Sequence, residues 1–255
     1  MSNSLTRIAG LAAVVAGSIS AQALPNIVSV VETGGDTDRP SAKVTGMTFN
    51  IENPTGTVLV PNYTVGTFGE NAKAMTDRTH DYNSSSTTPS AIAGTVTVSL
   101  PSYLVGQEYI MIANNDRDNA GYQLKVTLAQ PSIVYLLIDN RLGDGDNTNP
   151  PDFSTLMTWV QTDLYIPFKA NGNHWGNPAF PDDVGIDESA DNTINQLSSV
   201  YAKLVPAGEL TLGDSMNSGR NMYGVVVAAI PEPGTATLVL LGGGALAWIS
   251  RRRRS

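Results

Sequence analysis

The chain has 255 residues and a formal net charge of −8, and it contains no cysteine, which excludes disulfide bonds and thiol catalysis. Without Arg7, Glu232 and the four terminal arginines, residues 24–230 keep ten Lys/Arg and 22 Asp/Glu, a net charge of about −12. A surface this acidic argues against nucleic-acid partners and against general adhesion to anionic lipid.

The N-terminal residues follow the pattern of a secretory signal peptide. Arg7 supplies a positive charge, an apolar run extends from Ile8 to Ile19, and Ala21 and Ala23 form a small-x-small cleavage site. Signal peptidase requires small side chains at these two positions. We therefore expect residues 1–23 to be removed after export by the Sec machinery; the alternative is a buried N-terminal helix.

The C-terminal residues 230–255 combine three features in a fixed order. Pro231, Glu232 and Pro233 come first, an apolar run follows at 235–249, and four arginines stand at 251–254. A helix of about fifteen residues is roughly 23 Å long, short for a bilayer span but sufficient if the arginines snorkel. Because basic flanks resist translocation, we predict a transmembrane helix at 235–249 with the preceding domain outside the inner membrane.

This order of features resembles the PEP-CTERM tail of Gram-negative bacteria. The resemblance implies that exosortase, a membrane protease-transpeptidase, recognises Pro231, Glu232 and Pro233 and processes the tail, leaving the domain in the cell envelope or outside the cell. It also implies a link to exopolysaccharide and biofilm production. The two prolines keep the segment extended and free of helix, where an enzyme can reach it. The alternative is an ordinary C-terminal anchor.

Residues 24–229 are expected to form one exported domain, in which strand-like runs alternate with turns. The runs predict an all-β fold, an antiparallel β-sandwich or jelly roll. Residues 132–138 are nearly all apolar and predict a central strand buried on both faces. Long loops are expected at 79–90 and 171–195, and a short helix or turn at 154–160. The predicted strands are 27–32, 42–51, 57–65, 92–99, 108–113, 122–128, 132–139, 162–168, 197–203, 208–212 and 222–229.

Several short strings in this domain resemble a galactose-binding-like β-sandwich module of secreted bacterial proteins. The strings are 76–78, 101–106, 108–110, 113–116, 134–141, 205–213 and 222–227. Such modules often lie beside carbohydrate-active domains, so the resemblance implies a carbohydrate-binding-like sandwich. The chain departs from the pattern after Arg141, where such modules tend to carry an aromatic residue and this chain has the polar insertion 143–151.

Acidic residues form two candidate calcium sites. Asp144 and Asp146 offer oxygen ligands at the alternating spacing that calcium favours, although the twelfth position counted from Asp144 is Thr155 rather than the glutamate of an EF-hand. The alternative is a turn whose Asp and Asn side chains bond their own backbone. The same two interpretations apply to a second cluster, which consists of Asp182, Asp183, Asp187, Glu188 and Asp191. No other cofactor is expected.

A saccharide site needs an aromatic plate that stacks on the sugar, beside polar groups that pair with its hydroxyls. Trp175 in a polar loop and Trp159 are the candidate plates, and Arg141 is a candidate ligand-binding residue. The alternatives are that the tryptophans pack over a sheet edge and that Arg141, like Arg78 after Asp77, pins a loop by bidentate contact with a carboxylate.

Catalytic signatures are scarce. His80 and His174 have no metal-ligand spacing, and neither Gly-x-Ser-x-Gly nor His-Glu-x-x-His occurs. We therefore expect no enzymatic activity. The leading hypothesis is an envelope or extracellular-matrix protein that binds polysaccharide. A purely structural matrix protein is the alternative, and a glycan hydrolase, for which carboxylates are plentiful, is the third.

Overall fold

The computed structural model describes residues 25–35, 66–84, 99–170, 179–189, 191, 193–217 and 219–230. The predicted signal peptide, most of the C-terminal tail, the predicted strands 42–51, 57–65 and 92–98, and Trp175 lie outside these residues. Within the described part of the chain, no helix is both long and apolar enough to cross a membrane. The transmembrane helix at 235–249 therefore stays a prediction.

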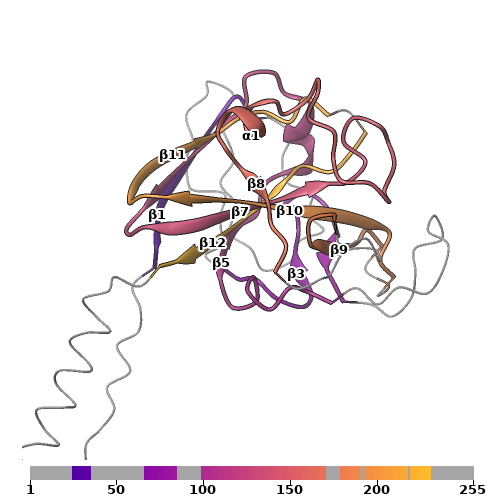
Figure 1. The fold of residues 1–255 in the computed structure, drawn as a ribbon, viewed down its shortest axis with the longest axis horizontal. Coiled ribbons are helices and arrows are strands. Elements are labelled where there is room, and N and C mark those ends of the chain that lie inside the picture. Colours follow the sequence, from indigo (N-terminus) through magenta and orange to yellow (C-terminus); the bar gives the residue numbers. More distant parts are fainter. Residues whose placement is uncertain are drawn as a thin grey trace, which may run out of the picture.

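Strands dominate the described residues (Figure 1). The helical elements are one short 3₁₀ helix, η1, at Asn114–Asp118, and one short α-helix, α1, at Trp159–Thr162. The strands are β1 (Ile27–Thr33), β2 (Gly66–Thr67), β3 (Ala72–Lys73), β4 (Asp81–Tyr82), β5 (Glu108–Ile110), β6 (Gln123–Leu128), β7 (Ser132–Asp139), β8 (Ile166–Pro167), β9 (Asp183–Asp187), β10 (Gln196–Val205), β11 (Gly208–Leu212) and β12 (Gly224–Ala229).

The strands form two sheets in which neighbouring strands run antiparallel. The small sheet has the order β1-β6-β11, and the large sheet has the order β2-β5-β12-β7-β10-β9-β4-β3, with β8 paired to β10. This arrangement confirms the predicted all-β, antiparallel class and fits a β-sandwich.

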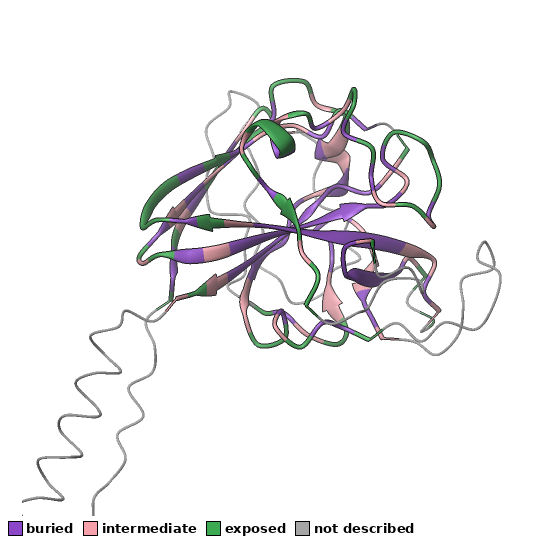
Figure 2. Cartoon of the chain, viewed as in Figure 1, coloured by how far each residue is buried: buried purple, intermediate pink, exposed green. Residues whose placement is uncertain are grey.

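Strand β7 is the centre of the large sheet, between β12 and β10. Its alternate side chains point to opposite faces, and both faces are covered (Figure 2). Val134, Leu136 and Ile138 belong to one buried cluster, whereas Tyr135 and Leu137 belong to another. The nearly continuous apolar run of β7 is therefore required by burial on two sides, which confirms the prediction of a central strand.

The first cluster joins the two sheets. Leu124 and Val126 of β6 and Leu212 of β11 pack there with the β7 residues. The second cluster covers the opposite face of the large sheet, where Phe68 and Leu104 are fully buried. The large sheet thus lies between two apolar cores, and its central strands are packed on both faces.

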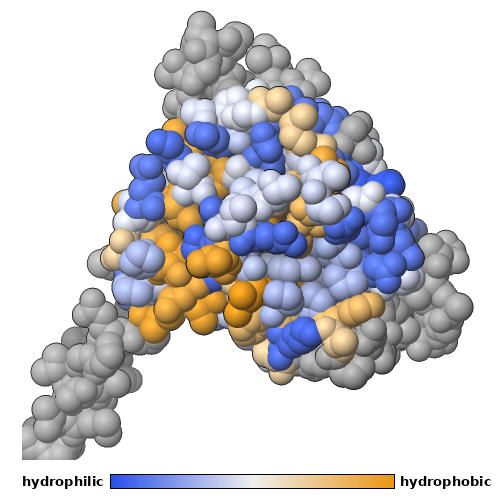
Figure 3. Space-filling model, turned by 45° about the horizontal axis from the view of Figure 1, so that its top comes forward, coloured by the Kyte–Doolittle hydropathy of each residue, from blue (hydrophilic) through white to orange (hydrophobic). Residues whose placement is uncertain are grey.

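The two ends of the central strands differ in character. At one end, which we call the terminal end, β7 begins at Ser132, β10 ends at Val205 and β12 ends at Ala229. Val205 and Ala229 are both register partners of Ser132. At the opposite end, which we call the loop end, β7 ends at Asp139 and β10 begins at Gln196. In Figure 3, apolar residues gather at the lower left, the side on which β12 ends in Figure 1, and hydrophilic residues gather to the right.

Three sequence-based predictions need correction. The segment 79–90 was expected to be a loop, but it contains the two-residue strand β4, which pairs with β3 and β9. The segment 171–195 was expected to be a loop, but it contains β9, whose five residues are all buried. The run 162–168 was expected to be one strand, but α1 and the two-residue strand β8 occupy this region. The break follows from a turn at Leu164, whose φ of 64° lies in the left-handed region and whose N–H donates to the Gln161 carbonyl.

Candidate functional site

The loop end of β7 is organised by a buried carboxylate. The Asp139 side chain is 1% exposed, and it accepts hydrogen bonds from Arg141 Nε (2.9 Å) and Nη2 (2.6 Å). It also accepts the backbone N–H groups of Arg141 and Asn221, each at 2.9 Å. A buried carboxylate needs this number of donors to offset the loss of water. The bidentate pair is the loop-pinning role that the sequence suggested for Arg141.

A second acidic side chain, Glu188, approaches the same arginine. Its Oε1 lies 3.6 Å from Arg141 Nη2 and 3.9 Å from His80 Nε2, and it accepts a hydrogen bond from the Asn221 amide. Burial lowers the pKa of His80, although the Glu188 carboxylate acts in the opposite direction. Burial thus favours the neutral form of His80, and Arg141 is the cation that approaches Glu188.

The loop after Arg141 is built from turns closed by side chains. Asp144 Oδ1 accepts the Asp146 N–H at 2.8 Å, and Asp146 Oδ1 accepts the Thr148 N–H at 2.8 Å and the Thr148 hydroxyl at 2.7 Å. These two bonds lower the pKa of Asp146. The carboxylates thus act as turn acceptors, in agreement with the turn interpretation of this loop.

Asn147 fastens the loop to the start of β10. Its amide oxygen accepts the Leu197 N–H at 2.9 Å, and its amide nitrogen donates to the Asn195 carbonyl at 3.3 Å. The Asn140 amide in turn donates to the Asn147 carbonyl at 3.3 Å. The 141–148 loop is therefore held on one side by Asp139 and on the other by β10, although residues 143–146 are exposed.

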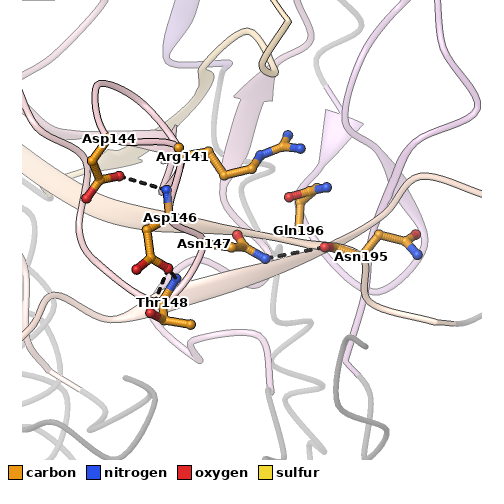
Figure 4. Close-up of a pocket in the computed structure, with 8 residues that line it drawn as sticks. Arg141, Asp144, Asp146, Asn147, Thr148, Asn195 and Gln196 are labelled. Atoms are coloured by element: carbon orange, nitrogen blue, oxygen red, sulfur yellow. Dashed lines mark hydrogen bonds between the residues drawn. The ribbon is translucent and has the colours of Figure 1, made fainter. Parts of the chain in front are cut away.

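A pocket of about 370 Å³ lies between this loop and the start of β10 (Figure 4). Asp144, Asp146 and Thr148 lie on one side of it, and Asn195 and Gln196 lie on the other. The oxygen Oε1 of Gln196 is buried and has no hydrogen-bond partner among the described residues. The full lining is Arg141, Asp144, Gly145, Asp146, Asn147, Thr148, Asn195 and Gln196, a polar set without an aromatic ring.

The structure brings three sequence-predicted residues together. Arg141 was a candidate ligand-binding residue, and Asp144 and Asp146 were candidate calcium ligands. All three line one pocket. Asn147, Asn195 and Gln196 were missed. The polar composition of the loop was the available signal for Asn147, whereas Asn195 and Gln196 reach the pocket only through strand pairing. Trp175, the sorting residues Pro231, Glu232 and Pro233, and the cleavage residues Ala21 and Ala23 lie outside the described residues.

Trp159 lies elsewhere and is used in packing. Its indole N–H donates to the Asp214 carbonyl at 2.7 Å, and its ring makes edge contacts with Tyr165 and Tyr223, at centroid distances of 6.1 and 5.7 Å. It is not among the residues that line the pocket. This arrangement corresponds to the packing interpretation of Trp159 rather than to a saccharide plate.

Among the described residues, no group of three or more His, Asp or Glu side chains is placed to hold a metal ion. The second acidic cluster is spread over several environments. Asp187 and Asp191 accept backbone N–H groups two residues ahead, as in turns, and Asp182 accepts the Tyr103 hydroxyl at 3.0 Å. The calcium hypothesis therefore gains no support from either cluster, and the turn interpretation accounts for the contacts.

Asp183 has a distinct environment. It is buried in β9, and its Oδ1 accepts hydrogen bonds from the Asn140 amide (3.2 Å) and the Ser199 hydroxyl (3.0 Å). Burial raises the pKa of Asp183 to about 7, although the two hydrogen bonds act in the opposite direction. Asp183 does not line the pocket, so its titration acts on stability rather than directly on a bound ligand.

Comparison with known proteins identifies the C-terminal segment. Residues 229–254 match the family described as the PEP-CTERM protein-sorting motif. The resemblance of the tail is thereby confirmed: the motif indicates an exported protein of the cell envelope, recognised by exosortase and anchored at its C-terminus before processing. No curated protein and no solved structure matches the chain. The galactose-binding-like resemblance is therefore not supported by any homologue.

The raised pKa of Asp183 predicts a pH dependence of stability. In the folded state Asp183 keeps its proton up to about pH 7, whereas the unfolded chain releases it near the ordinary value of 3.8. The free energy of unfolding should therefore fall as pH rises between these values, by at most ~1.4 kcal/mol per pH unit from this group. Urea unfolding of the wild type and of Asp183→Asn measures this slope as the difference between them. Equal slopes in the two proteins would contradict the assignment.

Proposed function

We propose that the exported domain is a non-enzymatic binding module of the envelope or extracellular matrix, and that its loop-end pocket takes a saccharide unit of exopolysaccharide. The observation that carries this proposal is the polar pocket between the 141–148 loop and β10, which Gln196 lines. A volume of about 370 Å³ falls within the ~300–1,000 Å³ range of small-ligand pockets.

The chemistry of the lining supports a hydroxyl-rich ligand. Side-chain amides both donate and accept, and carboxylates accept, so the set can pair with hydroxyl groups in several orientations. The buried Gln196 Oε1 has no hydrogen-bond partner among the described residues, which costs about 1–3 kcal/mol, and a turn of this side chain toward the pocket would let a ligand hydroxyl donate to it. Without an aromatic plate in the lining, we expect weak binding, with a dissociation constant on the order of 1 mM.

Two features support a non-enzymatic role. A glycan hydrolase needs a carboxylic acid with a raised pKa at the scissile bond. In the pocket, Asp146 has a lowered pKa because it accepts two hydrogen bonds from Thr148. The carboxyl with the raised pKa, Asp183, is buried away from the pocket lining.

The sorting tail gives the module its location. Exosortase is the partner that the C-terminal motif supports. We propose that signal peptidase cleaves after Ala23, that the 235–249 segment spans the inner membrane of a Gram-negative cell, and that exosortase then releases this anchor. The link to exopolysaccharide and biofilm belongs to the same proposal, and it rests on the resemblance of the tail to the PEP-CTERM family.

Replacing Pro231, Glu232 and Pro233 together by alanine should block processing, because the extended recognition segment is lost. Immunoblots of fractionated cells should then show the full-length chain retained in the inner membrane, with the domain still exported. Replacement of Thr235 and Thr237 by alanine, which leaves the three motif residues in place, is the control. Normal maturation of the triple variant would show that Pro231, Glu232 and Pro233 are not the sorting signal.

The pocket is tested with Gln196→Leu. This change removes the unpartnered amide but keeps a side chain of similar size, so the melting temperature should stay equal or rise slightly while saccharide binding falls at least tenfold. Gln123→Leu, on an exposed position of β6, is the matched control and should bind as the wild type does. NMR titration of the full-length chain in detergent with millimolar glycan measures the binding, and thermal unfolding followed by circular dichroism measures the melting temperature.

Unchanged binding by Gln196→Leu would overturn the assignment of the pocket. If no glycan shifts the NMR signals of the wild type at millimolar concentration, the purely structural alternative takes its place. Release of reducing sugar from the organism's own exopolysaccharide would instead favour the hydrolase.

A further inference from the structure

The terminal end of the large sheet is formed by segments without a charged residue. Residues 25–31, 128–133, 204–208 and 226–230 contain no Asp, Glu, Lys or Arg. They meet in space: the Ile230 N–H donates to the Pro131 carbonyl at 2.9 Å, and the Asn26 amide donates to the Ser132 hydroxyl at 2.6 Å. Both limits of the domain, at residues 25 and 230, therefore lie at this one end.

Apolar side chains at the terminal end are open to solvent. Ala228, Ile133 and Leu204 are register partners across β12, β7 and β10, so they form one row on the sheet. Leu204 is 66% exposed, and its two neighbours are half-buried. Pro131 and Pro206, in the adjoining turns, are exposed as well. This apolar row is small, and its position beside the sorting tail is what makes a contact with an apolar surface a reasonable inference.

The sorting tail places a membrane close to this row. Only four residues separate Ile230, the last described residue, from Thr235, where the apolar run of the tail begins. An extended chain covers at most about 18 Å over that interval. The polar headgroup layer of one leaflet is itself roughly 5–8 Å thick. While the tail is in place, the terminal end therefore cannot move far from the lipid surface.

The charge distribution also favours placing the terminal end, rather than the loop end, next to the membrane. The acidic body as a whole would be repelled by anionic lipid. Near the terminal end, the Glu108 carboxylate is turned inward and accepts the backbone N–H groups of Asn26 and Ile27, and the cation Lys203 adjoins Leu204. The acids of the 141–148 loop lie at the opposite end of β7. Glu209, which follows the uncharged segment 204–208, lies 3.4 Å from Lys125 Nζ. The terminal end thus carries little net charge and repels anionic lipid less than the loop end does.

We propose that the terminal end is a membrane-docking surface, which rests the row Ala228–Ile133–Leu204 on the outer face of the bilayer that holds the chain's own tail. Docking directs the loop-end pocket away from the lipid and toward the extracellular matrix. The surface leaves the membrane when exosortase removes the anchor. This inference rests on the proposed anchoring of the tail, and it assigns an orientation that the sorting motif does not specify.

Single spin labels on the full-length chain test this orientation. Because the chain has no cysteine, a label at Leu204→Cys, Asn149→Cys or Leu240→Cys is unique. The chain is reconstituted in vesicles of phosphatidylethanolamine with a minority of phosphatidylglycerol, and collision rates with oxygen and with a water-soluble nickel chelate are measured. The Leu204 label should show a severalfold higher oxygen-to-nickel ratio than the Asn149 label, which lies beside the pocket.

The tail label separates failure of the inference from failure of the anchor. A lipid-exposed label at position 240 with a fully aqueous label at 204 would overturn the docking surface but leave the anchor intact. An aqueous label at 240 would overturn the anchor and the docking together. Low collision rates with both reagents at 204 would show burial against a second copy of the chain, and would also overturn the proposal.

Discussion

The buried carboxylate of Asp139 is the interaction on which the loop end of this domain depends. It follows seven residues of β7 that are packed between two apolar cores, so it stands where water is excluded. Arg141 and the Asn221 N–H satisfy it, and this links the central strand to the loop before β12. The chain therefore leaves the sheet in a defined direction, and the exposed 141–148 loop begins from a fixed point. Without that anchor, the turns made by Asp144 and Asp146 would have no fixed position relative to β10.

The two ends of β7 differ in charge. One end of β7 is uncharged and adjoins both limits of the described chain, whereas the other end carries Asp139, Arg141 and the pocket. In the proposed docking, a sorting tail attached at the uncharged end orients the pocket away from the membrane. The proposed membrane anchor and the proposed binding pocket thus lie at opposite ends of one sheet, although they arise from different parts of the sequence.

The all-β class and the central strand could be predicted, because continuous apolar residues at 132–138 leave no solvated face. The strand β9 could not. Asp183, Gly185 and Asp187 are poor strand formers, and the buried Asp183 pairs with Asn140 and Ser199, which are distant in sequence. The candidate site, too, could be predicted only in part. Arg141, Asp144 and Asp146 lie within one polar loop and were identified, whereas the opposite wall reaches the loop through pairing that no local pattern encodes, as the Asn147–Leu197 contact across 50 residues shows.

The central claim is that Asp139 holds the loop end, and hydrogen exchange of Asp139→Asn tests it most directly. Asparagine cannot replace the charge that faces Arg141, and breaking a buried pair costs about 3–5 kcal/mol. The account predicts that backbone amides of residues 141–148 and of Asn221 lose protection first, while amides of the terminal end, such as Val205 and Ile230, keep theirs relative to the global unfolding limit. Unchanged protection of the 141–148 loop, or an equal loss at both ends of the sheet, would contradict it.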